Sequence, residues 1–355
     1  MSELTTHERM SRIFAHKEAD RAPISDVPWR TTLQRWHREG MPKEVSWVDF
    51  FGVDNIVGIG VDGSPRYPVQ VLEQNDEYTI KTTAWGATLK EWVHTGGVPE
   101  FLDFTIVDRV TWEEAKARMT PSPDRVNWQK LQVNYPEWRK QGAWIRAGLW
   151  FGFDVTHSWV VGTERVLFAL MDDPEWLMDI WNHQLDVQLA LYDQVWEAGY
   201  HFDEITWPDD MGYKGTQFFS VQMYRDLLQP VHKRAVDWAH AHGVKVRLHS
   251  CGDVRPFVPE FIKIGIDCLN PIEVKAGMDP LQLKEQYGAQ LAFHGGLNAV
   301  LYDDMDAMIG EMEKVIPKMI VNGGYIIGTD HSIPDSVGIE QFRRFVAKAK
   351  ELGKY

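Results

Sequence analysis

Short apolar runs alternate with longer amphipathic stretches along most of the chain. Eight apolar runs, bounded by turn-forming residues, predict strands at Pro23–Val27, Asn55–Ile59, Trp144–Leu149, Glu204–Trp207, Val244–His249, Cys268–Ile272, Leu291–Phe293 and Tyr325–Gly328. Helical periodicity fills the intervals after the later runs, at Thr163–Gly199 (two helices, broken near Asp173-Pro174), Ser220–His242, Asp303–Asn322 and Ser336–Leu352. Alternating strands and helices are typical of a parallel sheet, and eight strands fit a (β/α)8 TIM barrel. A doubly wound open sheet is the alternative.

Two further patterns complete the predicted fold. Thr5-Thr6-His7-Glu8 has the spacing of a capping box and predicts an N-terminal helix through about Ala15. The stretch 62–141 is long for a loop, and within it Tyr78–Thr83 and Thr88–Val93 alternate around a short turn, which indicates a hairpin. We therefore expect a single domain over residues 1–355, with 62–141 as an insertion.

Composition narrows the class of protein. The chain is 44% hydrophobic and carries a net charge of −14 without clustered Lys and Arg, so we expect no nucleic-acid partner. The sequence contains no run of about 18 apolar residues, so we expect no membrane-spanning segment. The polar N-terminus does not resemble a secretory signal. With only two Cys, a disulfide framework is not indicated, and a cytoplasmic protein is the simplest expectation.

The segment Lys245–Asp253 carries the sharpest chemical signal. It reads as a strand that ends in His249-Ser250-Cys251 before a glycine turn. Residues two apart on a strand point to the same face, so His249 and Cys251 can present an imidazole and a thiolate to one point. Both groups are preferred zinc ligands, although a free Cys is often only a small buried hydrophobe.

Acid, imidazole or thiolate groups recur at the ends of the later predicted strands, where barrel enzymes carry their chemistry. This pattern predicts a metal or acid–base site. We expect His331 as the third metal ligand, with Asp330 as its alternative. Candidate acid–base groups are Glu204, Asp210 and Asp330. Cys268 begins its strand, so we expect it to be core.

Aromatic residues make up 12% of the chain, including 16 Trp. Core packing under long loops explains most of them, and an aromatic-lined pocket for a flat or apolar substrate is the functional alternative. The candidate substrate contacts are Trp29, Trp150, Trp207, Glu273 and His294.

Four motifs stand out along the chain: Glu8-Arg9-Met10, Asp20-Arg21-Ala22-Pro23, His249-Ser250-Cys251-Gly252-Asp253 and Gly328-Thr329-Asp330-His331-Ser332-Ile333-Pro334. Together they resemble the uroporphyrinogen decarboxylase superfamily. The resemblance runs nearly end to end and implies a single (β/α)8 barrel with its site at the carboxyl ends of the strands. The true decarboxylases carry an early Arg-Gln-Ala-Gly-Arg stretch that binds substrate carboxylates. Here that region reads Pro28-Trp29-Arg30-Thr31-Thr32-Leu33, which argues against porphyrinogen decarboxylation.

The chain is more similar to the zinc-dependent, corrinoid-linked methyltransferases of that superfamily. The resemblance implies that His249 and Cys251 bind zinc, and it aligns the third ligand of that branch, a Cys, with His331. Imidazole in place of thiolate makes the zinc a stronger Lewis acid, which suits an oxygen ligand. We therefore expect demethylation of a methoxylated, aromatic substrate. Glu204, Asp209 or Asp210 is expected as a fourth zinc ligand or as the proton donor to the leaving oxygen.

The resemblance also implies a methyl acceptor outside this chain. The Asp-x-His-x-x-Gly signature of a cobalamin module is missing. We therefore expect Co(I) corrinoid on a partner protein, with a folate as the open alternative for the acceptor. Analogy with barrels of this superfamily also allows a homodimer.

Two other functions compete with this expectation. One is a metal-free decarboxylase or lyase of the same fold, which predicts no bound zinc and a more basic pocket. The other is a non-enzymatic binding or accessory protein with a degraded site, which predicts that His249, Cys251 and His331 can be replaced without loss.

Overall fold

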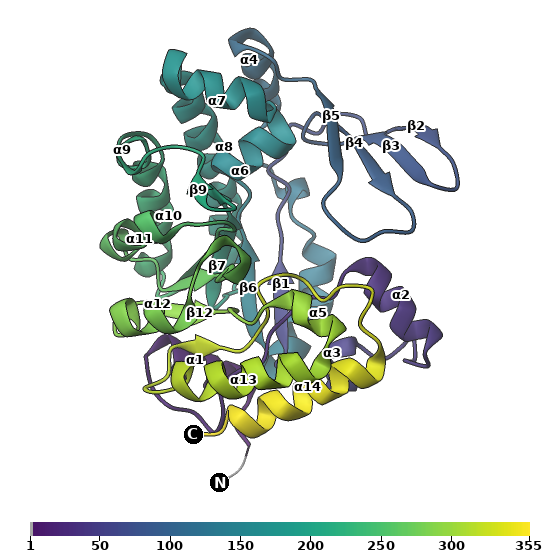
Figure 1. Ribbon diagram of the computed structural model, residues 1–355. Helices are drawn as coiled ribbons and strands as arrows, with labels where there is room; N and C mark the ends of the chain where they lie inside the picture. Colours follow the sequence, from purple (N-terminus) through teal and green to yellow (C-terminus); the bar gives the residue numbers. More distant parts are fainter. Residues whose placement is uncertain (1–2) are drawn as a thin grey trace.

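A computed structural model describes residues 3–355, and a curled parallel sheet lies at its centre (Figure 1). In spatial order its seven strands are β1 (Ile56–Ile59), β6 (Trp144–Gly148), β7 (Glu204–Pro208), β10 (Lys245–His249), β11 (Cys268–Asn270), β12 (Ala292–His294) and β13 (Tyr325–Ile326). Every neighbouring pair is parallel. Seven of the eight predicted strands are therefore present, and their bounds lie within two residues of those predicted.

The remaining predicted strand, Pro23–Val27, is an extended segment instead. Ile24 makes one isolated parallel bridge to Ile327, and its amide donates to the Asp54 carboxylate at 2.7 Å rather than to a neighbouring strand. Pro23 and Pro28 have no N–H to give to a ladder, which limits strand pairing here. The expected eight-stranded barrel is thus confirmed in part, as an α/β fold with a curled seven-stranded sheet.

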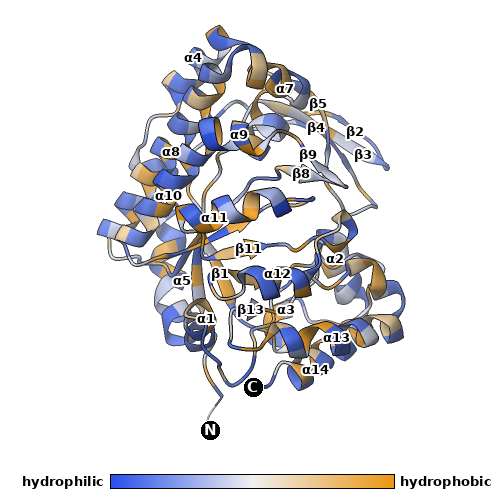
Figure 2. Ribbon diagram, turned by 60° about the vertical axis from the view of Figure 1, so that its left-hand side comes forward, coloured by the Kyte–Doolittle hydropathy of each residue, from blue (hydrophilic) through white to orange (hydrophobic). Residues whose placement is uncertain are grey.

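Most of the helices pack on the outside of the sheet, with their apolar faces turned inward (Figure 2). The helices of the described chain are α1 (Thr6–Phe14), α2 (Arg30–Arg38), α3 (Trp47–Phe51), α4 (Arg109–Arg118), α5 (Trp128–Lys140), α6 (Phe153–Val155), α7 (Thr163–Asp172), α8 (Pro174–Glu197), α9 (Val221–Met223), α10 (Gln229–Ala241), α11 (Val258–Ile264), α12 (Pro280–Tyr287), α13 (Met305–Met319) and α14 (Ile339–Leu352). None of the helices within residues 3–355 is both long and apolar enough to cross a membrane.

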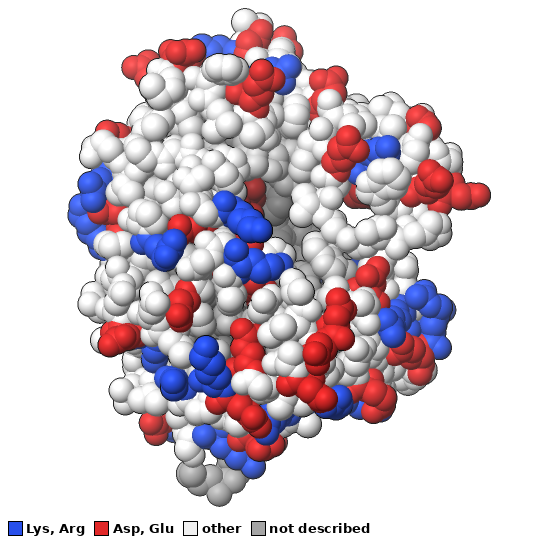
Figure 3. All heavy atoms as spheres, viewed as in Figure 1, with Lys and Arg blue, Asp and Glu red and all other residues white. Residues whose placement is uncertain are grey.

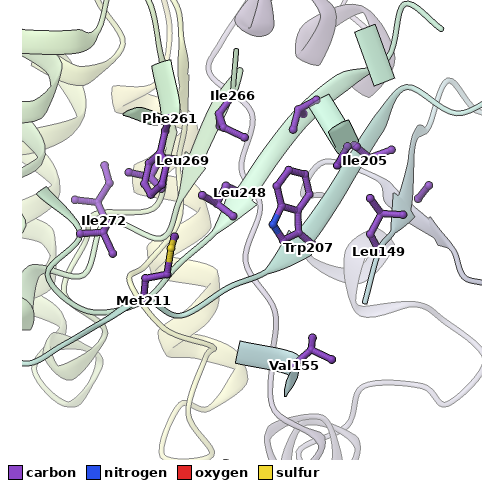
Figure 4. Packing of buried hydrophobic residues seen from close by; sticks show 14 of the residues in the cluster. Leu149, Val155, Ile205, Trp207, Met211, Leu248, Phe261, Ile266, Leu269 and Ile272 are labelled. Atoms are coloured by element: carbon purple, nitrogen blue, oxygen red, sulfur yellow. The ribbon is translucent and has the colours of Figure 1, made fainter. Parts of the chain in front are cut away.

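Local sequence signals explain several of these boundaries. Thr5 and Glu8 form the predicted capping box at the start of α1. Pro174 occupies the first position of α8, so the chain breaks between α7 and α8 as expected. Outward-facing strand residues pack against the helices, as Figure 4 shows for Leu149, Ile205 and Leu248.

Residues from α1 close the amino-terminal end of the sheet. Met10, Ile13 and Phe14 pack there with the inward-facing Trp144 and Cys268. Cys268 is fully buried in this apolar cluster, which confirms that it is a core residue.

The insertion folds into a small antiparallel sheet beside the main one (Figure 1). Its strands are β2 (Val71–Gln74), β3 (Tyr78–Thr82), β4 (Ala87–Trp92) and β5 (Glu100–Phe104), and the predicted hairpin is β3–β4. A second hairpin, β8 (Gly212–Tyr213) with β9 (Thr216–Gln217), follows β7.

Candidate metal centre and substrate cavity

A cavity of about 790 Å³ opens at the carboxyl ends of the strands. In Figure 3 the surface is hollowed beside the small antiparallel sheet. The apolar residues that line the cavity include Val27, Val61, Trp85 and Trp150. Polar groups from other strands, His249 and Asn270 among them, also line it, so the space suits an apolar body with a few polar contacts.

His249 and Cys251 lie together at the end of β10. Their Nε2 and Sγ atoms are 3.4 Å apart. A tetrahedral zinc with bonds of about 2.1 Å to nitrogen and about 2.3 Å to sulfur would separate these atoms by about 3.6 Å. The Nδ1 atom of His249 is 2.8 Å from Oδ1 of Asn270, an arrangement that assigns the proton to Nδ1 and leaves Nε2 as a free acceptor.

Asp210 joins this pair from the loop after β7. One ligand atom from each of Asp210, His249 and Cys251 lies within 4.8 Å of the others. The Asp210 Oδ1 atom also accepts the backbone N–H of Cys251 at 2.7 Å, which fixes the two loops relative to each other. Asp210, predicted from the sequence as a zinc ligand or an acid–base group, therefore lies where a metal ligand would be.

A second group shares Cys251. It consists of Cys251, Glu273 and His331, again with ligand atoms within 4.8 Å of one another. Glu273 accepts the backbone N–H of Gly252 at 2.6 Å. The structure thus brings His331 to Cys251, but no such group within residues 3–355 contains both His249 and His331. Glu273, expected to contact substrate, lies among these potential ligands.

The electrostatics of the cluster favour a cation. Burial raises the pKa of the Cys251 thiol well above its usual range, and the nearby carboxylates of Asp210 and Glu273 raise it further. Burial also raises the pKa of Asp210. A divalent ion would offset these costs by stabilising thiolate and carboxylate together, and the nitrogen, sulfur and oxygen donors fit zinc.

Asp330 has a different position from its neighbour His331. Its side chain is buried and accepts the backbone N–H groups of Ala299 at 2.9 Å and Val274 at 3.2 Å. Asp330 thereby ties together the loops after β11 and β12. A hydrogen bond to Asp330 is the main cause that raises the pKa of His331. Of the two alternatives for the third ligand, the structure places His331 beside Cys251.

Glu204 and His294 lie deeper in the sheet. Glu204 is fully buried, pairs with Arg247 at 2.6 Å and accepts the Trp144 indole N–H at 2.8 Å. His294 contacts Arg247 through Nδ1 at 2.6 Å and the Ser25 carbonyl through Nε2 at 2.9 Å. Burial and Arg247 lower the pKa of His294 well below its usual range, so its imidazole is neutral. Glu204, unlike His294, is not among the residues that line the cavity.

The three predicted tryptophan contacts separate in space. Trp150 lines the cavity, packs edge-on against Trp159, and has a buried indole N–H without a hydrogen-bond partner in residues 3–355. Trp207 is also among the residues that line the cavity, but its fully buried indole points to the helix side, where it packs beside Leu248 (Figure 4) and donates its N–H to His232 Nε2 at 3.4 Å. Trp29 caps α2 and lines a separate, smaller pocket.

The sequence analysis did not predict most of the cavity wall that lies across from the candidate metal ligands. The cavity is also lined by Gly58 on β1, Gly60 just after β1, Arg146 on β6 and Trp85 in the β3–β4 turn. A signal existed, since Gly58-Ile59-Gly60-Val61-Asp62-Gly63 has the Gly-x-Gly-x-x-Gly spacing of a dinucleotide-binding turn. The chain enters the insertion after β1 instead of a helix, so the structural context for dinucleotide binding is missing.

Asp26 also lines the cavity and was not predicted. Its carboxylate accepts the N–H and hydroxyl of Thr329 at 3.0 and 2.7 Å. Burial nevertheless raises the pKa of Asp26 to about 7. Asp26 is therefore partly protonated near neutral pH and can give a proton to an oxygen in the cavity.

Together, the curled parallel sheet and the convergent His, Cys and carboxylate groups define a barrel-like α/β protein with a candidate metal site at its strand ends. The chain belongs to the uroporphyrinogen decarboxylase (URO-D) family, whose model matches residues 155–352. No curated protein matches the chain in sequence.

Solved structures share the fold at low sequence identity. A methyltransferase from Methanosarcina mazei is 16% identical, covers 98% of this chain and 99% of its own, and superposes with a TM-score of 0.68. A psychrophilic glycoside hydrolase family 10 endo-beta-1,4-xylanase is 12% identical over 61% of this chain and 76% of its own, with a TM-score of only 0.35. The first likeness supports the fold over the whole chain, and the second is too weak to carry an argument.

Proposed function

We propose that this protein is a zinc-dependent methyltransferase that demethylates a methoxylated substrate and passes the methyl group to a Co(I) corrinoid on a partner protein. The observation that carries the proposal is the convergence of His249 and Cys251 with Asp210 at the cavity mouth. Membership of the URO-D family and a fold shared with a methyltransferase support it.

Either His249, Cys251 and Asp210 would hold the zinc, or Cys251 would hold it with Glu273 and His331. Bound there, zinc would supply Lewis acidity to the ether oxygen. Asn270 keeps the His249 imidazole in the required tautomer, and Asp210 and Glu273 anchor the glycine turn that presents Cys251.

In the proposed reaction the methyl carbon–oxygen bond breaks and its electron pair stays on oxygen. The two electrons for the new bond to the methyl group come from the Co(I) corrinoid of the partner. Asp26 can return a proton to the leaving oxygen, since its pKa is about 7.

The cavity walls suit an aromatic ring. Trp85 and Trp150 line the space, and the unpartnered indole N–H of Trp150 can donate to a substrate oxygen. We therefore propose a methoxylated aromatic compound as the substrate.

The first test is the zinc content of the purified protein and of Cys251→Ala, with Cys268→Ala as the matched control. We expect about one zinc per chain in the wild type and the control, and none in Cys251→Ala, whose circular dichroism should be unchanged. Zinc retained by Cys251→Ala would refute the site. With zinc loaded, methoxylated aromatics are then mixed with free Co(I) cobalamin, and demethylated product is measured.

A metal-free decarboxylase or lyase is the second candidate. The observation in its favour is Arg146, a basic group on the cavity wall. This alternative predicts that a carboxylate substrate loses CO₂ in protein stripped of metal, whereas the methyltransferase predicts no turnover without zinc.

A further inference from the structure

Arg146 is an arginine without a counter-ion at the bottom of the cavity. It lies in the middle of β6, where alternation along the strand places it on the same face as the inward-pointing Trp144. Its side chain lines the cavity. Within residues 3–355 no carboxylate lies within ion-pairing distance of Arg146, and its guanidinium makes no side-chain hydrogen bond that meets ordinary geometry.

The neighbouring charges leave this part of the cavity positive. Glu204 is the register partner of Arg146, but its carboxylate is held by Arg247 at 2.6 Å and by Trp144 at 2.8 Å. His294 adds no charge, because it is neutral. Glu204 therefore compensates the charge of Arg247 and leaves Arg146 without a paired carboxylate. Burial and Arg247 lower the pKa of Arg146 to about 10, which still leaves it charged at neutral pH.

The cavity wall beside Arg146 is formed by glycines, so no side chains fill the space there. Gly58 is the register partner of Arg146 on β1, and Gly60 and Gly148 follow toward the mouth. A Cβ atom built at any of the three would meet nothing within 4 Å. The cavity therefore has free volume directly next to an unpaired cation, which is the arrangement of a binding site for an anion.

We propose that Arg146 binds a carboxylate of the substrate at the floor of the cavity. That the opposite end of the substrate carries the methyl group rests on the proposed function. Arg146 is level with Lys245 through the registers of β6, β7 and β10, and His249 lies four residues beyond Lys245. At about 3.3 Å per residue, this offset is about 13 Å along the strands. The Arg146 side chain extends into the cavity, so the distance from its guanidinium to His249 is shorter than this offset. The remaining distance suits a benzoate ring with a methoxy group.

The chemistry of the floor favours a carboxylate over a phosphate. One planar guanidinium matches one planar carboxylate through two parallel hydrogen bonds. The second guanidinium, that of Arg247, is already neutralised by Glu204. The apolar walls then enclose the rest of the molecule, which makes the expected substrate an aromatic monocarboxylate.

The test is calorimetric binding to the zinc-loaded protein, with 4-methoxybenzoate, benzoate, methoxybenzene and inorganic phosphate as probes. We expect both carboxylates to bind at least tenfold more tightly than methoxybenzene and phosphate. Arg146→Met should weaken the carboxylates about 30- to 100-fold and leave methoxybenzene unchanged. Arg30→Met is the matched control, because Arg30 is exposed and lies outside the cavity, and it should bind all probes as the wild type does.

A second variant tests the space instead of the charge. Gly58→Val fills the volume beside Arg146 without removing its guanidinium, and we expect it to lose benzoate binding while it keeps zinc. Benzoate bound equally by wild type and Arg146→Met would overturn the proposal, as would tighter binding of phosphate than of benzoate.

Benzoate has no methyl group, so these readouts do not depend on methyl transfer. Arg146-dependent benzoate binding without any demethylation would leave the carboxylate subsite standing while the proposed function fails. Demethylation of methoxybenzene as fast as of 4-methoxybenzoate would refute the carboxylate subsite and leave the proposed function standing.

Discussion

Replacing Glu204 by Gln should destabilise the protein strongly, because it removes the buried carboxylate that pairs with the buried Arg247. The Glu204 side chain is fully buried, and its contacts with Arg247 and Trp144 are 2.6 and 2.8 Å long. Breaking a buried ion pair on one side typically costs about 3–5 kcal/mol, since the remaining charge stays desolvated and unpaired. Here Arg247 would lose its counter-ion while Arg146 adds repulsion, so we expect a value in the upper part of that range.

Urea denaturation followed by tryptophan fluorescence measures this change in the free energy of unfolding. Glu351→Gln is the matched control, because Glu351 pairs with Lys348 at 3.2 Å and its side chain is 66% exposed. Exposed pairs of this kind contribute about 0–1 kcal/mol, so the control should unfold almost as the wild type does.

A double variant separates charge from packing. Glu204→Gln with Arg247→Met removes the unpaired cation along with its partner, and we expect it to recover a large part of the lost stability. A loss below about 1 kcal/mol in Glu204→Gln alone would refute the reasoning, since it would mean that the buried layer is neither desolvated nor short of negative charge.

Two further predictions concern the mouth of the cavity. Asn270→Ala should weaken zinc binding about 10- to 100-fold, because the His249 imidazole loses the hydrogen bond that fixes its tautomer. Competition with a chelator measures the zinc affinity, and an unchanged affinity would exclude Asn270 from the site. Asp26 has a pKa of about 7 in the folded protein, above about 3.9 in the unfolded chain, so the native state binds the extra proton and stability falls as pH rises from about 4 to 7. Asp26→Asn should remove that part of the pH dependence, and identical profiles of unfolding free energy against pH would contradict the assignment.

The sheet could be predicted because its strands are buried on both faces. Such strands are short apolar runs, and their ends are marked by turns, so seven of them were located from the sequence. Pro23–Val27 was predicted in the same way, yet its backbone hydrogen bonds go to Asp54, Ile327 and Ile333. Strand pairing of that segment depends on groups far away in the chain, which the local pattern does not contain.

The site could be predicted only where its geometry is local. His249 and Cys251 are two residues apart on one strand, so their proximity follows from the pleat. Glu204 and Asp210 look equivalent in sequence, but one begins β7 and the other follows it. Six residues of extended chain separate them by about 20 Å, and only Asp210 reaches the metal candidates. Arg146 gave no signal, because its lack of a counter-ion is a property of the assembled sheet.

The two sides of the cavity come from different halves of the chain. Every candidate metal ligand follows residue 209, within the region that matches the family model, 155–352. The glycine wall, Trp85, Arg146 and Trp150 all precede residue 155 and lie outside that match. In the proposed function, the first half of the chain would set the substrate and the second half would supply the metal chemistry. Exchanging residues 23–150 with those of another family member would therefore change the substrate specificity and keep the candidate metal ligands.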